Sequence, residues 1–315
     1  MSDTQIVRIN SESVDSIATK TCLALGNFDG VHIGHQKLIQ EAKNISVKKQ
    51  VPCAMMTFYP HPRSVVMDNK DYQKLITPWE TKKEILNSLG VEIIYLVGFN
   101  MDFARITPTE FVTNYIRRVQ AIDVVVGEDF KYGKAGQGTA ATLLEDGAKH
   151  GFDVLTVPSV MYGDVKVSSS LIRQLLLAGN MKETKHLLNR DLQIRGHIID
   201  GEKRGRTLGF PTANISLSDD YLLPKYGVYS VKVIYNDKAF LGVLNIGCKP
   251  TFHKNKQESS VEVHILDFDE DIYGKHVSIE FMEYIREERR FDSKEQLIEQ
   301  INTDIQQARN IYKKL

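Results

Sequence analysis

The sequence predicts an α/β domain with a parallel sheet, followed by a compact antiparallel β-barrel that ends in a helix. Short apolar runs alternate with helical patterns through the first three-fifths of the 315 residues. Past about Asn189, β-rich runs follow one another, separated by Gly, Pro, Asn and Asp. The C-terminal residues carry a single apolar stripe at helical spacing. We therefore expect two domains, at residues 1–188 and 189–315.

In the first domain, the alternation of strands and helices implies a parallel sheet with helices on both faces, where ligands bind at the carboxyl ends of the strands. The apolar runs that predict its strands are residues 22–25, 54–58, 93–97, 124–126 and 154–157.

Helix starts in this domain are indicated by two Thr-Pro pairs. Thr77-Pro78 and Thr107-Pro108 each offer an N-cap Thr and a proline at the first helical position, with an acid at the third. A further helix is expected where Leu38, Ala42 and Ile45 fall at helical spacing.

The second domain is expected to be a barrel because its strands are short and separated by turn residues. The runs that predict them are residues 194–199, 228–235, 240–245, 261–266 and 277–281. Ser293 and Gln296 are spaced as a capping box. The apolar stripe of the terminal helix, which we expect to pack on the barrel, comprises Leu297, Ile301, Ile305, Ala308 and Tyr312.

Composition excludes several classes of partner. Lys+Arg and Asp+Glu are both 40, so nothing global favours binding to a nucleic acid or an anionic membrane. Cys22, Cys53 and Cys248 are odd in number and far apart, which favours buried thiols in a reducing compartment. The polar N-terminus lacks the pattern of a signal peptide, and no apolar run approaches membrane-spanning length. We expect a soluble cytoplasmic protein, with oligomeric state left open.

The strongest motif, GNFDGVHIGH, spans residues 26–35, between an apolar strand and an amphipathic helix. Unpaired N–H groups and the helix dipole favour a phosphate at such a turn, and glycines let the backbone approach it. His32 is expected in the loop and His35 in the first helical turn. Two imidazoles placed there can stabilise charge when a phosphate attacks the α-phosphate of ATP. The candidate nucleotide-binding residues of the loop are Gly26, Asn27, Phe28 and Asp29.

Two later segments of the first domain extend this candidate site. Gly127 and Asp129 belong to a glycine-rich turn after a strand. It is not a P-loop, because five residues separate its glycines and Ala135 stands where Ser or Thr would hold magnesium. Ser168 and Ser169 then offer hydroxyls at a helix start, and Arg173 lies near its first turn, where it could clamp phosphates.

A glycine-rich string at residues 201–214 is the strongest motif of the second domain. Backbone N–H groups freed by glycine can cradle phosphates, and the hard oxygens of Thr212 and Asn214 suit Mg²⁺. Mg²⁺-bound ATP is the expected guest, and its other candidate contacts are Gly205, Arg206, Gly209, Phe210 and Pro211.

These motifs carry a resemblance to known enzymes. GNFDGVHIGH resembles the HxGH nucleotidyltransferases, and its full wording resembles the FMN adenylyltransferase module of bacterial bifunctional riboflavin kinase/FAD synthetases. GRTLGFPTAN, at residues 205–214, resembles the signature of riboflavin kinases. The resemblance implies a Rossmann-like nucleotidyltransferase domain and a barrel of riboflavin-kinase type. Their substrates would be riboflavin, FMN and ATP.

The resemblance also assigns roles to residues that read otherwise as surface charges. It places a catalytic carboxylate at Glu262, on an alternating strand. It also matches residues 285–291, which include Arg286, to a segment near the flavin-covering loop. It matches the serine-rich helix start to a phosphate-binding motif and residues 127–133 to a segment near the flavin and adenine. At residues 58–62, Tyr59 stands where the family often has an acid.

Two alternatives remain open at this point. One half of the chain could be active while the other keeps only its fold. Alternatively, the chain could be a flavin-sensing regulator built on the same folds. A regulator that binds nucleic acid should show a basic patch or an added helix-turn-helix segment, and the sequence contains neither.

Overall fold

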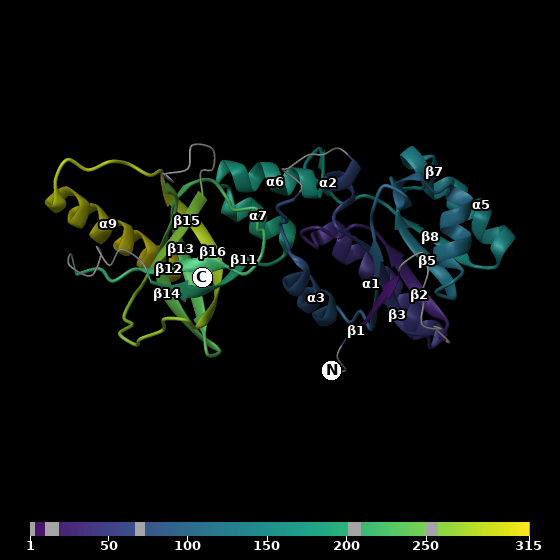
Figure 1. Ribbon diagram of the computed structural model, residues 1–315, viewed down its shortest axis with the longest axis horizontal. Coiled ribbons are helices and arrows are strands. Elements are labelled where there is room, and N and C mark those ends of the chain that lie inside the picture. Colours follow the sequence, from purple (N-terminus) through teal and green to yellow (C-terminus); the bar gives the residue numbers. More distant parts are fainter. Residues whose placement is uncertain (1–3, 10–18, 67–72, 201–208, 250–257, 315) are drawn as a thin grey trace. The chain divides into compact units, whose positions relative to one another are not determined.

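The computed structural model describes residues 4–9, 19–66, 73–200, 209–249 and 258–314. The chain forms two compact units that divide between Ser169 and Ser170. Figure 1 shows a layered α/β unit and a barrel unit, each containing its own sheet. The α/β fold followed by an antiparallel barrel is confirmed.

The first unit is built on a six-stranded parallel sheet in the order β1-β4-β3-β2-β5-β8. All five expected strands are present and extend by one or more residues beyond the expected runs. The edge strand β1 was not expected, because its residues are mostly half-buried or exposed and give only a weak apolar signal. The strands are β1 (Gln5–Ile9), β2 (Thr21–Leu25), β3 (Cys53–Tyr59), β4 (Ile93–Gly98), β5 (Ala121–Gly127) and β8 (Asp153–Val157).

Each face of this sheet has its own apolar core. One core includes Leu38, Ile39 and Ala42 of α1 (Ile33–Lys49) together with Leu86 of α3 (Trp79–Ser88). The other includes residues of α4 (Pro108–Phe111), of the π-helical turn at Val112–Ile116 and of α5 (Ala140–His150). Helices on both faces, as expected, leave the ends of the strands as the place for ligands.

The two Thr-Pro signals have different outcomes. Thr107 is the N-cap of α4 and forms a complete capping box with Glu110. The expectation for Thr77 is wrong: α3 begins at Trp79 with Pro78 as its N-cap, and no side chain caps it. Thr77 is buried, and its backbone N–H donates to the carboxylate of Asp29. A tertiary contact therefore replaces the local cap.

Several short elements lie on the rim of the first unit. They are α2 (Pro62–Val66), the 3-10 turns at Phe103–Arg105 and Lys134–Gly136, and the two-residue strands β6 (Lys131–Tyr132), β7 (Gly138–Thr139), β9 (Met161–Tyr162) and β10 (Val165–Lys166).

The second unit is a closed antiparallel barrel in the order β11-β12-β15-β14-β13-β16. The sequence missed β12, because its residues read as the end of a glycine-rich loop until pairing with β11 and β15 makes them a strand. The barrel strands are β11 (Leu192–Ile199), β12 (Ala213–Leu217), β13 (Gly227–Tyr235), β14 (Lys238–Lys249), β15 (Glu258–Ile265) and β16 (His276–Arg286).

Helices cover this barrel. α6 (Ser169–Ala178) leads into α7 (Met181–Leu188), which packs on β11 and β16. The terminal helix α9 (Lys294–Tyr312) begins at the expected cap Ser293 and packs on β13, β14 and β16. Its stripe is right except at its last residue, since Tyr312 is exposed. The fully buried residues of α9 are Ala308, which belongs to the stripe, and Asp304, which does not.

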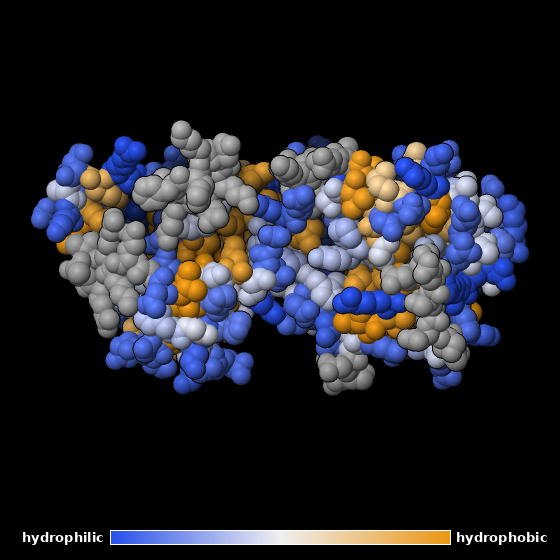
Figure 2. Space-filling view, viewed as in Figure 1, coloured by the Kyte–Doolittle hydropathy of each residue, from blue (hydrophilic) through white to orange (hydrophobic). Residues whose placement is uncertain are grey.

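Two expectations from composition can be compared with the structure. Cys22 and Cys53 are buried on adjacent strands, and burial raises the pKa of each thiol to about 12, which keeps them unreactive. No helix among the described residues is both long and apolar enough to cross a membrane. Figure 2 shows one face of the molecule, which is largely hydrophilic with apolar residues exposed between the polar ones.

Candidate functional site

The first candidate site is the loop between β2 and α1. β2 pairs with β3 on one side and with β5 on the other, so its carboxyl end lies where the order of the strands reverses. The loop turns tightly there: Phe28, Gly30 and Val31 all have positive φ, at 52°, 84° and 42°. Non-glycine residues adopt such angles rarely, and they cluster at functional sites. The structure thus places GNFDGVHIGH at a ligand-binding edge.

His32 and His35 form a stacked pair at the N-terminus of α1. Their ring centroids are 3.6 Å apart with an interplanar angle of 16°. His32 is the N-cap: its Nδ1 accepts the backbone N–H of His35 at 3.3 Å. A Cβ at Gly34 would lie 3.2 Å from the His32 ring, so glycine is what lets the ring occupy this position. The x-Gly spacing of the motif therefore has a steric cause.

The imidazole of His35 is held in its neutral form. Burial lowers the pKa of His35 well below its ordinary value, and the neighbouring charges of His32, Lys82 and Lys166 lower it further. Its Nδ1 is buried, with no hydrogen-bond partner among the described residues. A neutral, buried imidazole with an unused polar atom is suited to hydrogen-bonding a ligand at the helix terminus.

The Asp29 carboxylate and the Asn27 backbone carbonyl both hold the loop in place. The Asp29 carboxylate is 1% exposed and accepts the backbone N–H groups of Ile76 and Thr77, at 3.0 and 3.2 Å. The Asn27 carbonyl accepts the Thr57 hydroxyl at 3.0 Å and the Lys82 ammonium at 3.2 Å. These two members of the motif therefore fix its shape.

The remaining segments expected at this site lie at the end of β5 and at the start of α6. Gly127 ends β5, and Asp129 follows it and forms a 2.5 Å ion pair with Lys166 of β10. Ser169 donates its hydroxyl to the Asp29 carbonyl at 2.8 Å, which ties the start of α6 to the loop. Ser168 immediately precedes α6, and Arg173 lies about one turn into it with a buried side chain.

The second candidate site is a polar row across three barrel strands. Glu262 of β15 pairs in register with Asn214 of β12 and with Asn245 of β14. Residues opposite each other on neighbouring strands share a face, so the three side chains form one row. Asn214 is buried at 7% exposure, whereas Glu262 is half-buried. The expected carboxylate and the expected amide ligand therefore come from adjacent strands at one level.

A pocket of about 340 Å³ adjoins the remaining motif residues. Pro211 and Thr212 line it, opposite the segment from Phe268 to Tyr273. The Pro211 carbonyl lies 2.7 Å from Nδ1 of His264, and Phe210 meets the His264 ring edge to face at 5.8 Å. Gly209 has φ of 87°, a conformation that favours glycine. Gly205 and Arg206 lie outside the described residues.

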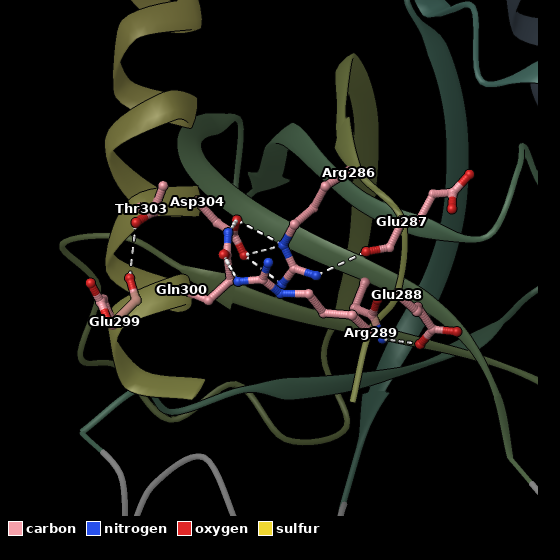
Figure 3. Close-up of polar contacts among 9 residues, drawn as sticks. Arg286, Glu287, Glu288, Arg289, Glu299, Gln300, Thr303 and Asp304 are labelled. Carbon is pink, nitrogen blue, oxygen red and sulfur yellow. Dashed lines mark hydrogen bonds and ion pairs between the residues drawn. The ribbon is translucent and has the colours of Figure 1, made fainter. Parts of the chain in front are cut away.

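Arg286, at the end of β16, is fixed by the terminal helix. Its guanidinium donates to both carboxylate oxygens of Asp304, at 2.7 to 3.1 Å, and to the Glu287 carbonyl. Gln300 also donates to Asp304, and Arg289 donates to Gln300 (Figure 3). Next to this network is a pocket of about 430 Å³, which is lined by Arg289, Arg290, Phe291, Gln296, Glu299, Gln300 and Thr303.

The buried carboxylate makes a stability prediction. Asp304 is 2% exposed, so replacing it with Asn leaves the Arg286 charge without its partner. We expect Asp304→Asn to lower the unfolding free energy by roughly 3 kcal/mol, the lower end for breaking a buried pair. Denaturant unfolding checks this, with Asn302→Ala, at an exposed position of the same helix, as the control. Equal midpoints for the two variants would contradict it.

Several residues of these sites were missed from the sequence. Lys82 and Asp304 are charged residues within amphipathic helices, where a solvated position is the ordinary expectation. Glu288 follows β16 and accepts the Asn245 amide at 2.9 Å, a contact between residues 43 positions apart. The segment from Phe268 to Tyr273, which lines the barrel pocket, was also missed, since acidic residues are its only distinguishing feature in the sequence.

Comparison with family models gives two matches. Residues 14–171 match a model described as FAD synthetase, and residues 188–312 match one described as riboflavin kinase. The first match contains the histidine pair, and the second contains the polar row and Arg286.

Curated relatives align along nearly the whole chain. A bifunctional riboflavin kinase/FMN adenylyltransferase of Bacillus subtilis is 44% identical over 92% of both chains. One of Listeria monocytogenes is 42% identical over 93% of both chains. A solved structure from Streptococcus pneumoniae, titled a macrolide-efflux protein, is 34% identical, with a TM-score of 0.90 over 97% of this chain and 99% of that chain.

Proposed function

The chain belongs to the family of bifunctional riboflavin kinase/FMN adenylyltransferases, and from that premise we propose which residues carry each of its two reactions. The barrel unit transfers the γ-phosphoryl group of ATP to riboflavin, giving FMN and ADP. The α/β unit joins FMN to the adenylyl group of ATP, giving FAD and pyrophosphate. Riboflavin, FMN and ATP are therefore the substrates.

The adenylylation site is the histidine pair at the N-terminus of α1, and the stacked geometry of that pair is the observation that carries the proposal. A phosphate oxygen of FMN attacks the α-phosphorus of ATP, and the bond to pyrophosphate breaks. His32 and His35 donate hydrogen bonds to the oxygens on which charge develops, together with the helix N–H groups. Ser168 and Ser169 hold the leaving phosphates. The sequence predicts the same role for Arg173, which belongs to the second unit.

Other residues of this site have supporting roles. Gly26 and Phe28 shape the surface that meets the nucleotide: a Cβ at Gly26 would lie 3.1 Å from the Phe28 ring, and that ring lies 5.1 Å from His35. Gly127 and Asp129 lie at and just beyond the carboxyl end of β5, the strand next to β2, and border the nucleotide site there.

The phosphorylation site is the polar row of the barrel. Glu262 accepts the proton of the attacking ribityl hydroxyl, as general bases do in kinases. The neighbouring pocket lined by Pro211 and Thr212 suits the nucleotide, and the pocket beside Arg289 and Phe291 suits the flavin ring, because it combines an aromatic face with amide and guanidinium groups. The phosphate-binding loop is assigned to Gly205, Arg206, Gly209 and Phe210. Arg286 orients the segment near the flavin-covering loop.

Mg²⁺ fits this second site. Thr212 and Asn214 supply neutral oxygens, and Asn214 lies beside Glu262 in register. Among the described residues, no group of three His, Cys, Asp or Glu side chains could hold a metal by itself. The neutral oxygens of Thr212 and Asn214 agree with an ion that is bound largely through substrate phosphates and water. When bound, Mg²⁺ would neutralise charge on the transferring phosphoryl group.

A coupled assay tests the proposal as a whole. The chain is incubated with riboflavin, ATP and Mg²⁺, and FMN and FAD are resolved by chromatography over time. We expect FMN to appear first and FAD to follow. A chain that forms only one product has a single working half, and a chain that binds flavin without forming either is a regulator.

We further propose that the kinase domain begins near Asn189, and two fragments test this. A fragment of residues 170–315 keeps α7, whose Leu187 and Leu188 are buried on the barrel side, whereas residues 189–315 do not. Both should convert riboflavin to FMN without forming FAD, and the shorter one should unfold at lower denaturant because β11 and β16 lose apolar cover. A folded fragment without kinase activity would overturn this boundary. We also propose that the protein acts in the cytoplasm.

A further inference from the structure

Lys82 is a buried cation beneath the nucleotide loop that the reaction as described does not use. It lies on α3, and only 6% of the residue is exposed. Lysines are almost never this buried unless their ammonium is paired or hydrogen-bonded. Its Nζ donates to the Asn27 carbonyl at 3.2 Å, in the middle of the GNFDG turn.

The position of Lys82 connects α3 to the loop. The same carbonyl also accepts the Thr57 hydroxyl, so Asn27 is held from β3 and from α3 at once. Asp29, two residues further on, bonds to the backbone just before α3. Burial lowers the pKa of Lys82, and the Asp29 carboxylate partly opposes this by favouring the charged form of the lysine. Two buried side chains therefore join the loop to α3: Asp29 from the loop and Lys82 from the helix.

Lys82 is one of three groups whose charge acts on His35. His32 acts from the loop, Lys82 from α3 and Lys166 from β10. The Lys166 side chain is 38% exposed and is neutralised by Asp129, so solvent and its partner screen its effect. Lys82 is buried, and its field at His35 is screened less.

We propose that Lys82 is a positioning residue for adenylyl transfer: its ammonium fixes the Asn27 carbonyl and thereby the loop, and its buried charge acts on the His35 imidazole. This inference rests on the proposed role of His35. A neutral imidazole can donate one hydrogen bond and accept another, whereas imidazolium can only donate. A fixed lysine thus supplies positive charge while the histidine keeps its hydrogen-bonding versatility.

The test uses Lys82→Met, which keeps the length of the side chain and removes its charge, in the full-length protein. Removing a positive charge raises the pKa of His35, so NMR titration of the imidazole should show the midpoint moving to higher pH. FAD formation should fall about tenfold or more, and its acid limb should move to higher pH. Lys83→Met, the neighbouring lysine of α3, is the matched control and should do neither.

The outcomes separate this inference from the proposed function. Lys82→Arg keeps the charge and should restore the His35 midpoint and most of the FAD formation. If Lys82→Met lowers FAD formation with no change in either the midpoint or the acid limb, Lys82 is merely structural and the inference fails. If His35→Ala has no effect on FAD formation, the proposed function itself fails. Riboflavin phosphorylation by each variant reports whether the barrel unit is intact.

Discussion

His35→Ala is expected to lower FAD formation from FMN by roughly two to three orders of magnitude, the usual effect of removing one preorganised donor from a transition state. The ring stacks on His32 and lies at the N-terminus of α1, so its loss removes a donor without removing an element of the core. Formation of FMN from riboflavin should be unchanged, because the kinase site is built in the other unit. Steady-state assays with each flavin measure the two rates separately.

The control for this variant is His150→Ala, in the last turn of α5. It changes the same residue type outside the loop and should leave both rates unchanged. If His35→Ala lowers both activities equally while the protein stays folded by circular dichroism, adenylylation has no separate site in the α/β unit. If neither rate changes, the histidine pair has no part in the reaction.

Glu262→Gln is expected to lower riboflavin phosphorylation by about two to four orders of magnitude, the range for loss of a general base. The amide keeps the shape of the side chain and its place beside Asn214 and Asn245, but it cannot accept a proton. FMN supplied from outside should still be converted to FAD. The measurement is the rate of FMN formation from riboflavin, ATP and Mg²⁺.

An exposed glutamate on the same barrel provides the comparison for this variant. Glu283→Gln, on β16, removes the same charge away from the polar row and should leave phosphorylation unchanged. A Glu262→Gln protein that turns over riboflavin like the wild type would remove Glu262 from the mechanism.

Patterns that act locally were sufficient to predict much of this structure. The apolar runs of the parallel sheet are nearly continuous because both faces of its strands are buried, so five of its strands were clear. The caps at Thr107 and Ser293 depend on a single turn of chain and were predicted correctly. At Thr77 the same signal was wrong, because Asp29, 48 residues away, accepts the N–H of that residue.

The parts of the sites that the sequence could not predict come from long-range contacts. The spacing of His32 and His35 pointed to the loop, but nothing in an amphipathic helix distinguishes the buried Lys82 from the half-buried Lys83 until α3 packs against the loop. The same difficulty applies to Asp304, because its partner Arg286 lies 18 residues earlier on a barrel strand. The strand β12 required its partners β11 and β15.

The pairing of Arg286 with Asp304 has a consequence for biosynthesis of the chain on the ribosome. Domains that precede others generally fold first during translation, and the α/β unit is complete in sequence well before the last helix is made. The Arg286 side chain gains its carboxylate partner only when residue 304 has left the ribosomal exit tunnel. A prematurely terminated chain that lacks α9 would therefore leave the Arg286 guanidinium without this carboxylate partner.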